Sequence, residues 1–192
     1  DDIIAQNLMM STHDWLLLFS DKGKVYRIKG YQVPEASRNA KGIPLVNLLN
    51  LDKDEKIKTL VTIKRDNEEY KYLFFVTKDG LCKKVAISEF DSIKKNGKIA
   101  ISLKENDELV TVKLTTGNDE IIIGASNGKA VRFSEDTVRP MGRTAAGVKG
   151  MNVDGSIVIG AASDKEGDHI LVVSKNGYGK KSVLDDYRLT SR

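Results

Sequence analysis

Cysteine, histidine and long apolar runs are scarce in this sequence, and each shortage excludes a class of protein. One cysteine, Cys82, stands among 192 residues, so the chain can build neither a disulfide framework nor a cysteine zinc site. The two histidines, His13 and His169, have no metal-ligand spacing to Cys, Asp or Glu, which predicts no metal site. No apolar run approaches the roughly 20 residues of a bilayer crossing, and no signal peptide opens the chain. We therefore expect a cytoplasmic protein with no membrane partner.

Catalytic motifs are equally scarce. The run 177–182 ends like a phosphate-binding loop, but Ser174 stands where that loop requires a glycine, and a hairpin is predicted there. No pattern of Ser, His and Asp indicates a nucleophile. Acidic runs such as 105–108 recur in turns, which is typical of solubilising turns rather than of calcium or glycosidase sites. The sequence predicts no catalytic residue, no metal and no cofactor within this chain.

What the chain does contain is a repeat. Four times, an apolar tetrad is followed by polar residues, a glycine and a second strand-like run. Counted from that glycine, the tetrad always occupies positions −7 to −4. These turn glycines, 57, 48 and 49 residues apart, are Gly23, Gly80, Gly128 and Gly177. A period of about 50 residues is typical of propeller-like blades and solenoids.

Each repeat is predicted to begin with a β-hairpin. The pairs Asp79-Gly80, Asn127-Gly128 and Asn176-Gly177 favour a two-residue type I′ turn, in which both residues have positive φ. A second glycine, at Gly42, Gly97 and Gly147, precedes a third strand, and an acidic turn precedes a fourth. The third strands are expected at 43–49, 99–103 and 148–153, and the fourth at 57–63, 109–114 and 157–161.

The repeat predicts an all-β fold, a propeller-like array of blades with about four strands each. Residues 1–10 contain the last strand of a further blade. Three units follow at 11–63, 64–114 and 115–161, and a partial fourth at 162–192. Short helical turns fit 33–38 and 88–94. We expect the chain to be a fragment of a longer array.

Charge is segregated along each unit. The segments from the hairpin turn to the second glycine hold 22 of the 31 basic residues but only 8 of the 27 acidic ones, so their net charge is +14. These segments are 22–42, 78–98, 129–149 and 175–192. The rest of the chain carries −10. Because equivalent segments of successive blades lie at equivalent radii, we expect one basic band on the perimeter.

Two positions of the repeat concentrate this charge. Position +4 after the turn glycine is basic in all four units, and basic residues recur near position −4 before the second glycine. Two readings stay open: phosphate contacts along a curved path, which we favour, or solvated strand faces. The candidate DNA-binding residues are Arg27, Lys29, Arg38, Lys41, Lys83, Lys84, Lys94, Lys95, Arg132, Arg139, Arg143, Lys149, Lys180, Lys181, Arg188 and Arg192.

Three stretches carry a resemblance to a known family. Residues 31–49, 138–151 and 176–181 resemble the C-terminal domain of the A-type subunit of bacterial DNA gyrase, and the similarity extends over the whole chain. The resemblance implies a six-bladed β-pinwheel with strands exchanged between blades, whose basic perimeter wraps duplex DNA for negative supercoiling. That family's wrapping motif, the gyrase box, is absent here, and four units stand in place of six.

The resemblance also implies partners outside this chain. The parent protein would be an ATP-dependent type II DNA topoisomerase, an A2B2 assembly of A-type and B-type gyrase subunits, acting on the nucleoid. ATP and Mg²⁺ would bind elsewhere, and this fragment would be non-catalytic. The alternatives are the C-terminal DNA-binding domain of topoisomerase IV, a propeller-like protein-interaction scaffold, and a propeller-type hydrolase. A scaffold predicts an apolar or mixed face, and a hydrolase predicts inward-pointing carboxylates.

Overall fold

The computed structural model describes residues 11–33, 49–94, 96–166, 169–173 and 179–183, and these form strands joined by turns and short 3-10 helices. The strands are β1 (Trp15–Ser20), β2 (Lys24–Lys29), β3 (Ile57–Ile63), β4 (Tyr72–Thr77), β5 (Leu81–Ala86), β6 (Lys98–Ile99), β7 (Leu109–Thr115), β8 (Glu120–Ala125), β9 (Ala130–Ser134), β10 (Val148–Lys149), β11 (Val158–Ser163), β12 (His169–Val173) and β13 (Gly179–Val183). The 3-10 helices are η1 (Gly30–Gln32), η3 (Ile87–Phe90), η4 (Glu135–Thr137) and η5 (Asp164–Glu166). The predicted all-β class is confirmed.

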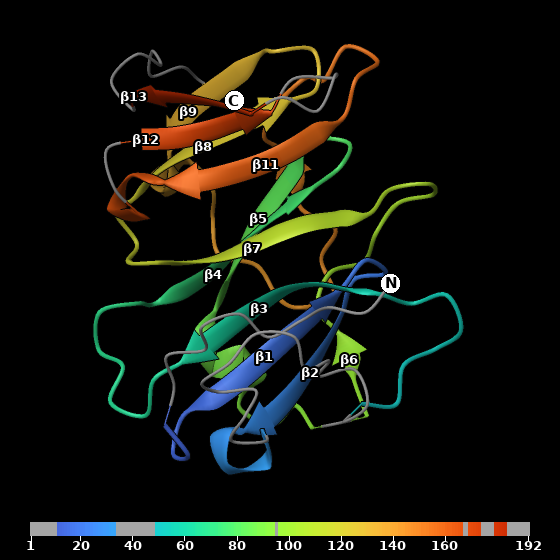
Figure 1. Ribbon diagram of the computed structural model, residues 1–192, viewed down its shortest axis with the longest axis vertical. Coiled ribbons are helices and arrows are strands. Elements are labelled where there is room, and N and C mark those ends of the chain that lie inside the picture. The colour runs from blue at the N-terminus through green and yellow to red at the C-terminus, as the bar shows by residue number, and fades with distance from the viewer. Residues whose placement is uncertain (1–10, 34–48, 95, 167–168, 174–178, 184–192) are drawn as a thin grey trace.

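The strands form four antiparallel sheets that follow one another along the long axis of the molecule (Figure 1). Their strand orders are β3-β1-β2-β6, β10-β5-β4-β7, β11-β8-β9 and β12-β13, which we name the first to fourth sheets. In the first three, the second strand of the sequence hairpin and the later fourth strand flank the first strand. Each of the first three repeats of the sequence therefore forms a sheet with the same strand order.

Strands are exchanged between neighbouring sheets. Strand β6 belongs to the second unit of the sequence but pairs with β2 of the first, with Lys24 opposite Ile99. Strand β10 of the third unit pairs in the same way with β5 of the second, with Leu81 opposite Lys149. The second and third units therefore each complete the sheet of the unit before them, as the family resemblance implied.

The exchange explains why the turn glycines recur. Two successive amides of each exchanged segment donate to a turn-glycine carbonyl: Ala100 and Ile101 to Gly23, at 2.8 and 3.1 Å, and Gly150 and Met151 to Gly80, at the same distances. A Cβ on Gly23 would lie 2.5 Å from the Ile101 carbonyl oxygen. Because the exchanged backbone passes against these turns, a side chain does not fit there.

The hairpin turns differ from the predicted type I′. Positive φ occurs at the glycines, for example 92° at Gly80, but neither Asp79 nor Asn127 has it. The Gly80 amide donates to the Thr77 carbonyl at 3.1 Å, and Gly23 and Gly128 repeat this bond. The turns are three-residue connections, a type I turn followed by a left-handed glycine. Asn176-Gly177 lies outside the described residues.

The predicted fourth strands are confirmed, and the third strands are shorter than predicted. Strand β3 has the predicted bounds, and β7 and β11 differ from prediction by one or two residues at their ends. Strands β6 and β10 have two residues each, because the next amides turn to the turn-glycine carbonyls. One predicted helical turn is η3. The predicted strands at 3–10 and 43–49 and the rest of the turn at 33–38 lie outside the described residues.

The core lies between the sheets. One cluster, which includes Leu17 and Phe75, fills the space between the first and second sheets, and another, which includes Phe74 and Phe133, lies between the second and third. Phe19 and Phe75 meet edge to face at 5.4 Å between ring centroids. Successive residues of β1 and β4 thus point into different clusters. Burial of both faces requires apolar residues without alternation, which is why the sequence shows tetrads.

Candidate nucleic-acid interface

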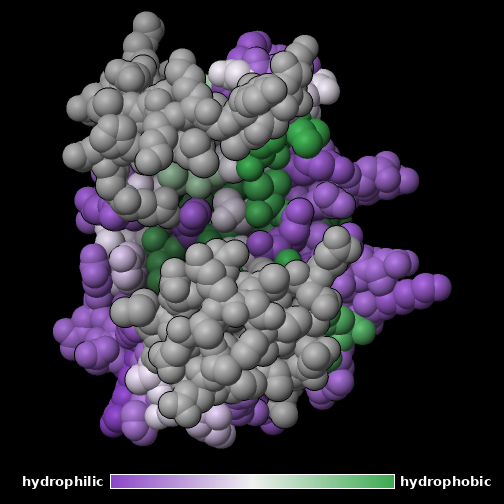
Figure 2. All heavy atoms as spheres, viewed as in Figure 1, coloured by the Kyte–Doolittle hydropathy of each residue, from purple (hydrophilic) through white to green (hydrophobic). Residues whose placement is uncertain are grey.

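Three of the predicted DNA-binding residues are exposed, on the segments that link a hairpin to its exchanged strand or on that strand itself. Lys94 lies between η3 and β6, and Arg139 and Lys149 lie between η4 and the end of β10. These three are named the perimeter cations below. Lys94 belongs to the second unit, and Arg139 and Lys149 belong to the third, each at a different position of the repeat. On the face shown in Figure 2, hydrophilic side chains dominate the edges, and hydrophobic ones gather mainly near the middle.

Position +4 of the repeat has a partner in every unit whose side chains are described. That partner is always the residue at position −8 on the neighbouring strand. The Arg27 guanidinium lies 3.4 Å from the ring centroid of Trp15, and the Lys84 ammonium lies 4.6 Å from that of Tyr72. In the third unit, Arg132 makes a bidentate ion pair with Glu120, with N–O distances of 2.8 and 3.0 Å.

The sequence pattern did not predict this pairing, although it contains a signal for it. Positions −8 and +4 are diagonal neighbours across the hairpin, close enough for long or aromatic side chains to meet. Trp15, Tyr72 and Glu120 are three different residue types, so no single residue type marks the position. What they share is the ability to stabilise a cation, through a π face or a carboxylate.

Lys84 is a correction to the predicted site. Its side chain is buried, and its ammonium donates to the Glu135 carbonyl at 3.1 Å and lies 3.6 Å from the Glu135 carboxylate. That carboxylate is itself fully buried and accepts hydrogen bonds from Thr115 Oγ1 and the amides of Gly117 and Asp119. A phosphate cannot reach Lys84, because η4 of the next unit covers it.

Lys83 is a second correction. Its side chain has no exposed surface, and its ammonium donates to the carbonyl oxygens of Gly142, Arg143 and Ala145 at 3.0, 2.8 and 2.8 Å. Burial, and to a lesser degree the positive charge of Arg143, lowers the pKa of Lys83 to about 7. Residues of the third unit cover both lysines, so neither Lys83 nor Lys84 belongs to the interface.

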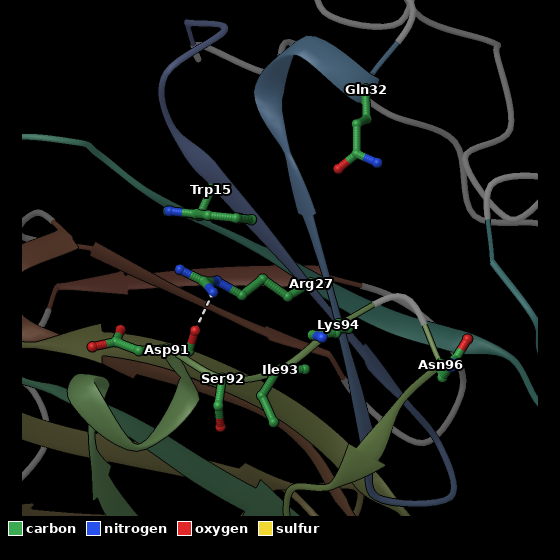
Figure 3. A pocket seen from close by; sticks show the side chains of 8 residues that line it. All are labelled: Trp15, Arg27, Gln32, Asp91, Ser92, Ile93, Lys94 and Asn96. Carbon is green, nitrogen blue, oxygen red and sulfur yellow. Dashed lines mark hydrogen bonds between the residues drawn. The ribbon is translucent and has the colours of Figure 1, made fainter.

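A cavity of about 520 Å³ opens at the border of the first and second sheets. Trp15 and Arg27 line it from the first sheet, and residues 91–94 line it from the loop that follows η3 (Figure 3). Figure 3 shows the Arg27 guanidinium beneath the Trp15 ring, donating a hydrogen bond to the Asp91 carbonyl. Lys29 approaches the same ring at 4.2 Å. Arg27 of the first unit and Lys94 of the second unit therefore line one hollow, which offers positive charge to an anionic group.

Arg143 and the remaining predicted residues complete the set. Arg143 is half-buried and donates to the Ile99 carbonyl at 2.8 Å, which ties the third unit to the exchanged strand of the second. For Lys180 and Lys181 the structure describes only the backbone of β13. The predicted residues outside the described ranges are Arg38, Lys41, Lys95, Arg188 and Arg192.

A comparison with protein families identifies the group to which these features belong. The family model described as "DNA gyrase C-terminal domain, beta-propeller" matches residues 14–64, 71–116, 119–163 and 168–192. The chain belongs to this family. Its repeats are the blades of a gyrase C-terminal domain, and the resemblance noted from the sequence is confirmed.

Individual relatives of the gyrase C-terminal domain agree. The DNA gyrase A-type subunit of Staphylococcus epidermidis is 50% identical over 195 residues, and that of Staphylococcus aureus strain NCTC 8325 is 48% identical. Both alignments cover the whole chain, which spans 22% of each relative's length. Because these sequence relatives are gyrase subunits, the gyrase reading stands ahead of the topoisomerase IV alternative.

Two solved structures share the fold. The C-terminal domain of DNA topoisomerase IV superposes with a TM-score of 0.80 at 30% identity, over 98% of this chain and 62% of that one. The DNA gyrase A C-terminal domain gives 0.77 at 28% identity, over 95% of this chain and 59% of that one. The β-pinwheel architecture is thus confirmed, and it is common to gyrase and topoisomerase IV.

The described part of this gyrase family member shows neither a metal-binding cluster nor a membrane-spanning helix. Among residues with described placement, no group of three or more His, Cys, Asp or Glu side chains could hold a metal ion. In the same ranges, no helix is long and apolar enough to cross a membrane.

Proposed function

We propose that this chain binds duplex DNA without sequence specificity along its basic perimeter and wraps it, in the service of negative supercoiling by DNA gyrase. The observation that carries the proposal is the placement of the perimeter cations Lys94, Arg139 and Lys149. They are exposed, and they lie on the linking segments and the exchanged strand of two successive units. Exposed cations on two neighbouring blades suit a phosphate backbone that passes from one blade to the next.

Phosphate contacts without base contacts give affinity that depends on salt and not on sequence. Each phosphate that a cation neutralises releases counterions, which contributes about −0.9 to the slope of log K against log salt. The three perimeter cations would thus contribute about −3 to that slope. Specificity would come from the path of the DNA and from the cost of bending it.

Wrapping requires contacts spread over several blades. Bending 20 to 30 base pairs by 40 to 90° costs on the order of 1 to 6 kcal/mol. One blade offers few exposed cations to offset that cost, whereas several sheets follow one another along the molecule (Figure 1). Affinity should therefore increase with duplex length until the DNA spans the array.

The remaining partners follow from the relatives, of which this chain spans about a fifth. The chain would work as part of an ATP-dependent type II topoisomerase. It would be joined to the rest of the A-type gyrase subunit, in an A2B2 assembly with the B-type subunit, on the bacterial nucleoid in the cytoplasm. ATP and Mg²⁺ would bind outside this chain, whose own residues would hold DNA without catalysing its cleavage.

A salt titration with a short duplex and one several times longer tests the proposal. We expect the triple variant Lys94→Gln, Arg139→Gln and Lys149→Gln to reduce the magnitude of the salt slope by about 3 with an unchanged melting temperature, because each lost phosphate contact removes about one counterion. The matched control is Lys58→Gln, which removes an exposed lysine from β3.

Relaxation of circular DNA with the protein bound gives the second measurement, and a positive topological shift is expected. A wild-type chain that binds neither duplex would contradict the proposal and favour the interaction scaffold. A triple variant with the wild-type slope would show that the perimeter cations do not touch phosphate.

A further inference from the structure

The third unit contributes a segment, residues 139–149, that crosses the second sheet before it pairs as β10. Backbone bonds fix it at two places. The Met141 amide donates to the Lys84 carbonyl at 2.8 Å, and beyond the segment the Gly150 amide donates to the Gly80 carbonyl, also at 2.8 Å. This crossing segment carries Arg139, Arg143 and Lys149. Whatever fixes its middle therefore fixes where three basic side chains lie.

The middle of the crossing segment is fixed by Lys83. Its ammonium donates hydrogen bonds to the carbonyl oxygens of Gly142, Arg143 and Ala145, all within 3.0 Å. An ammonium has three N–H donors, which these three acceptors use completely. A neutral amine would offer two donors and leave one carbonyl without this bond, and an apolar side chain would leave all three.

The second and third units meet at this lysine. Lys83 lies on β5 of the second unit, 5.3 Å from the Phe75 ring that packs against the first sheet. The Ala145 carbonyl that it binds also accepts the Ser102 amide at 3.3 Å, from the exchanged segment of the second unit. Position +3 holds Tyr26 in the first unit and Val131 in the third, whereas the fourth unit has a lysine there, Lys180.

We propose that Lys83 is a positioning residue, which holds the crossing segment on the second sheet and so sets where Arg139, Arg143 and Lys149 meet DNA. The DNA part of this proposal rests on the proposed function, whereas the attachment of the segment does not. Lys83 has no exposed surface and so acts on DNA through the segment alone.

Amide hydrogen exchange of the intact chain tests the attachment. We expect Lys83→Met to speed exchange at Met141 and Ser102 by at least about tenfold, because the three carbonyls lose their buried donor. The amides of the β1–β3 pairing should keep their wild-type rates. Lys58→Met, which replaces an exposed lysine on β3, is the matched control and should change none of these rates.

The pH dependence of the opening equilibrium, which is the exchange rate divided by the intrinsic rate of the same amide, gives a readout that simple packing would not produce. When the crossing segment is attached, which we call the closed state, Lys83 has a pKa near 7, because it is buried and lies near the charge of Arg143. Phe75, the side chain that faces it from β4, is uncharged. Opening restores the ordinary pKa of 10.5, so between about pH 7 and 10 opening takes up a proton. Opening should therefore become rarer as pH rises, by up to about tenfold per pH unit in the wild type and not at all in Lys83→Met.

A double-variant cycle tests the consequence for DNA. Lys83→Met should lower affinity for the longer duplex, and Arg139→Gln should cost less in the Lys83→Met background than in the wild type, because the displaced segment no longer presents Arg139.

The outcomes separate the two proposals. Unchanged exchange in Lys83→Met, or a wild-type opening equilibrium that does not change with pH once the intrinsic amide rate is divided out, would overturn the attachment even if DNA binding were normal. Faster exchange with wild-type affinity would overturn the role in placing the cations. A wild-type chain without DNA affinity would refute the proposed function and leave the exchange result standing.

Discussion

At the scale of single residues, the basic positions of this chain divide into two kinds. Lys94, Arg139 and Lys149 are exposed, whereas Lys83 and Lys84 are enclosed by the unit that follows them. The sequence does not distinguish the two kinds, because the residue type lysine says nothing about which segment of another unit covers the side chain. Burial of a charge is tolerated only with close partners, and both enclosed lysines have them.

The Lys84–Glu135 pair gives a prediction at this scale. Glu135→Ala should destabilise the chain by about 3–5 kcal/mol, because it leaves a buried ammonium without its carboxylate. Lys84→Met combined with Glu135→Leu should recover much of that loss. Urea denaturation followed by circular dichroism measures both. Equal losses in the single and double variants would show that the ion pair is not the source of the effect.

At the scale of elements, the unit of construction is a hairpin, a later fourth strand and a strand received from the next unit. The received strands β6 and β10 pair over only two residues each. Paired amide bonds to Gly23 and Gly80 extend their attachment, where the left-handed glycine leaves room for a passing backbone.

Gly80→Ala tests this attachment. A Cβ there would lie 2.3 Å from the Met151 carbonyl oxygen, on a residue with φ of 92°. We expect a loss of about 1–3 kcal/mol in the free energy of unfolding. Gly160→Ala is the control, because nothing lies within 4 Å of its added Cβ. If both variants were equally stable in urea, the close approach would not constrain the turn.

At the scale of the whole molecule, the second sheet shares a core cluster and an exchanged strand with the first sheet and likewise with the third. Stability in such an array is a sum of unit and interface contributions. Each exchanged strand is covalently part of the following unit while it pairs in the sheet of the preceding one. We therefore expect the first three sheets to unfold together.

The single tryptophan, Trp15, reports on the first sheet and allows a test. Phe133→Ala removes a buried ring of the third sheet that packs on Phe74, at a cost of about 3–5 kcal/mol. We expect the Trp15 fluorescence transition in guanidinium to shift together with the circular dichroism transition. A fluorescence midpoint that stays in place would mean that the sheets unfold independently.

Local patterns in the sequence determined the hairpins, the fourth strands and the segregation of charge. The apolar tetrad around Leu17 and the glycine that follows it are enough to place a hairpin, because both depend on residues near in the chain. The type I′ prediction was wrong because Asp79-Gly80 also fits a three-residue turn, and the passing segment near Met151 requires a glycine in either case.

Only the tertiary structure decided which cations are available to DNA. Strand exchange brings residues 139–149 across β5 from about 60 positions away in the chain, as the Lys83 bond to Arg143 shows. No local pattern encodes that contact, since it depends on which neighbour receives the strand. The sequence by itself therefore determined the repeat, its strands and its basic band. The packing of one unit on the next separated the lysines that hold the blades together from those that face solvent.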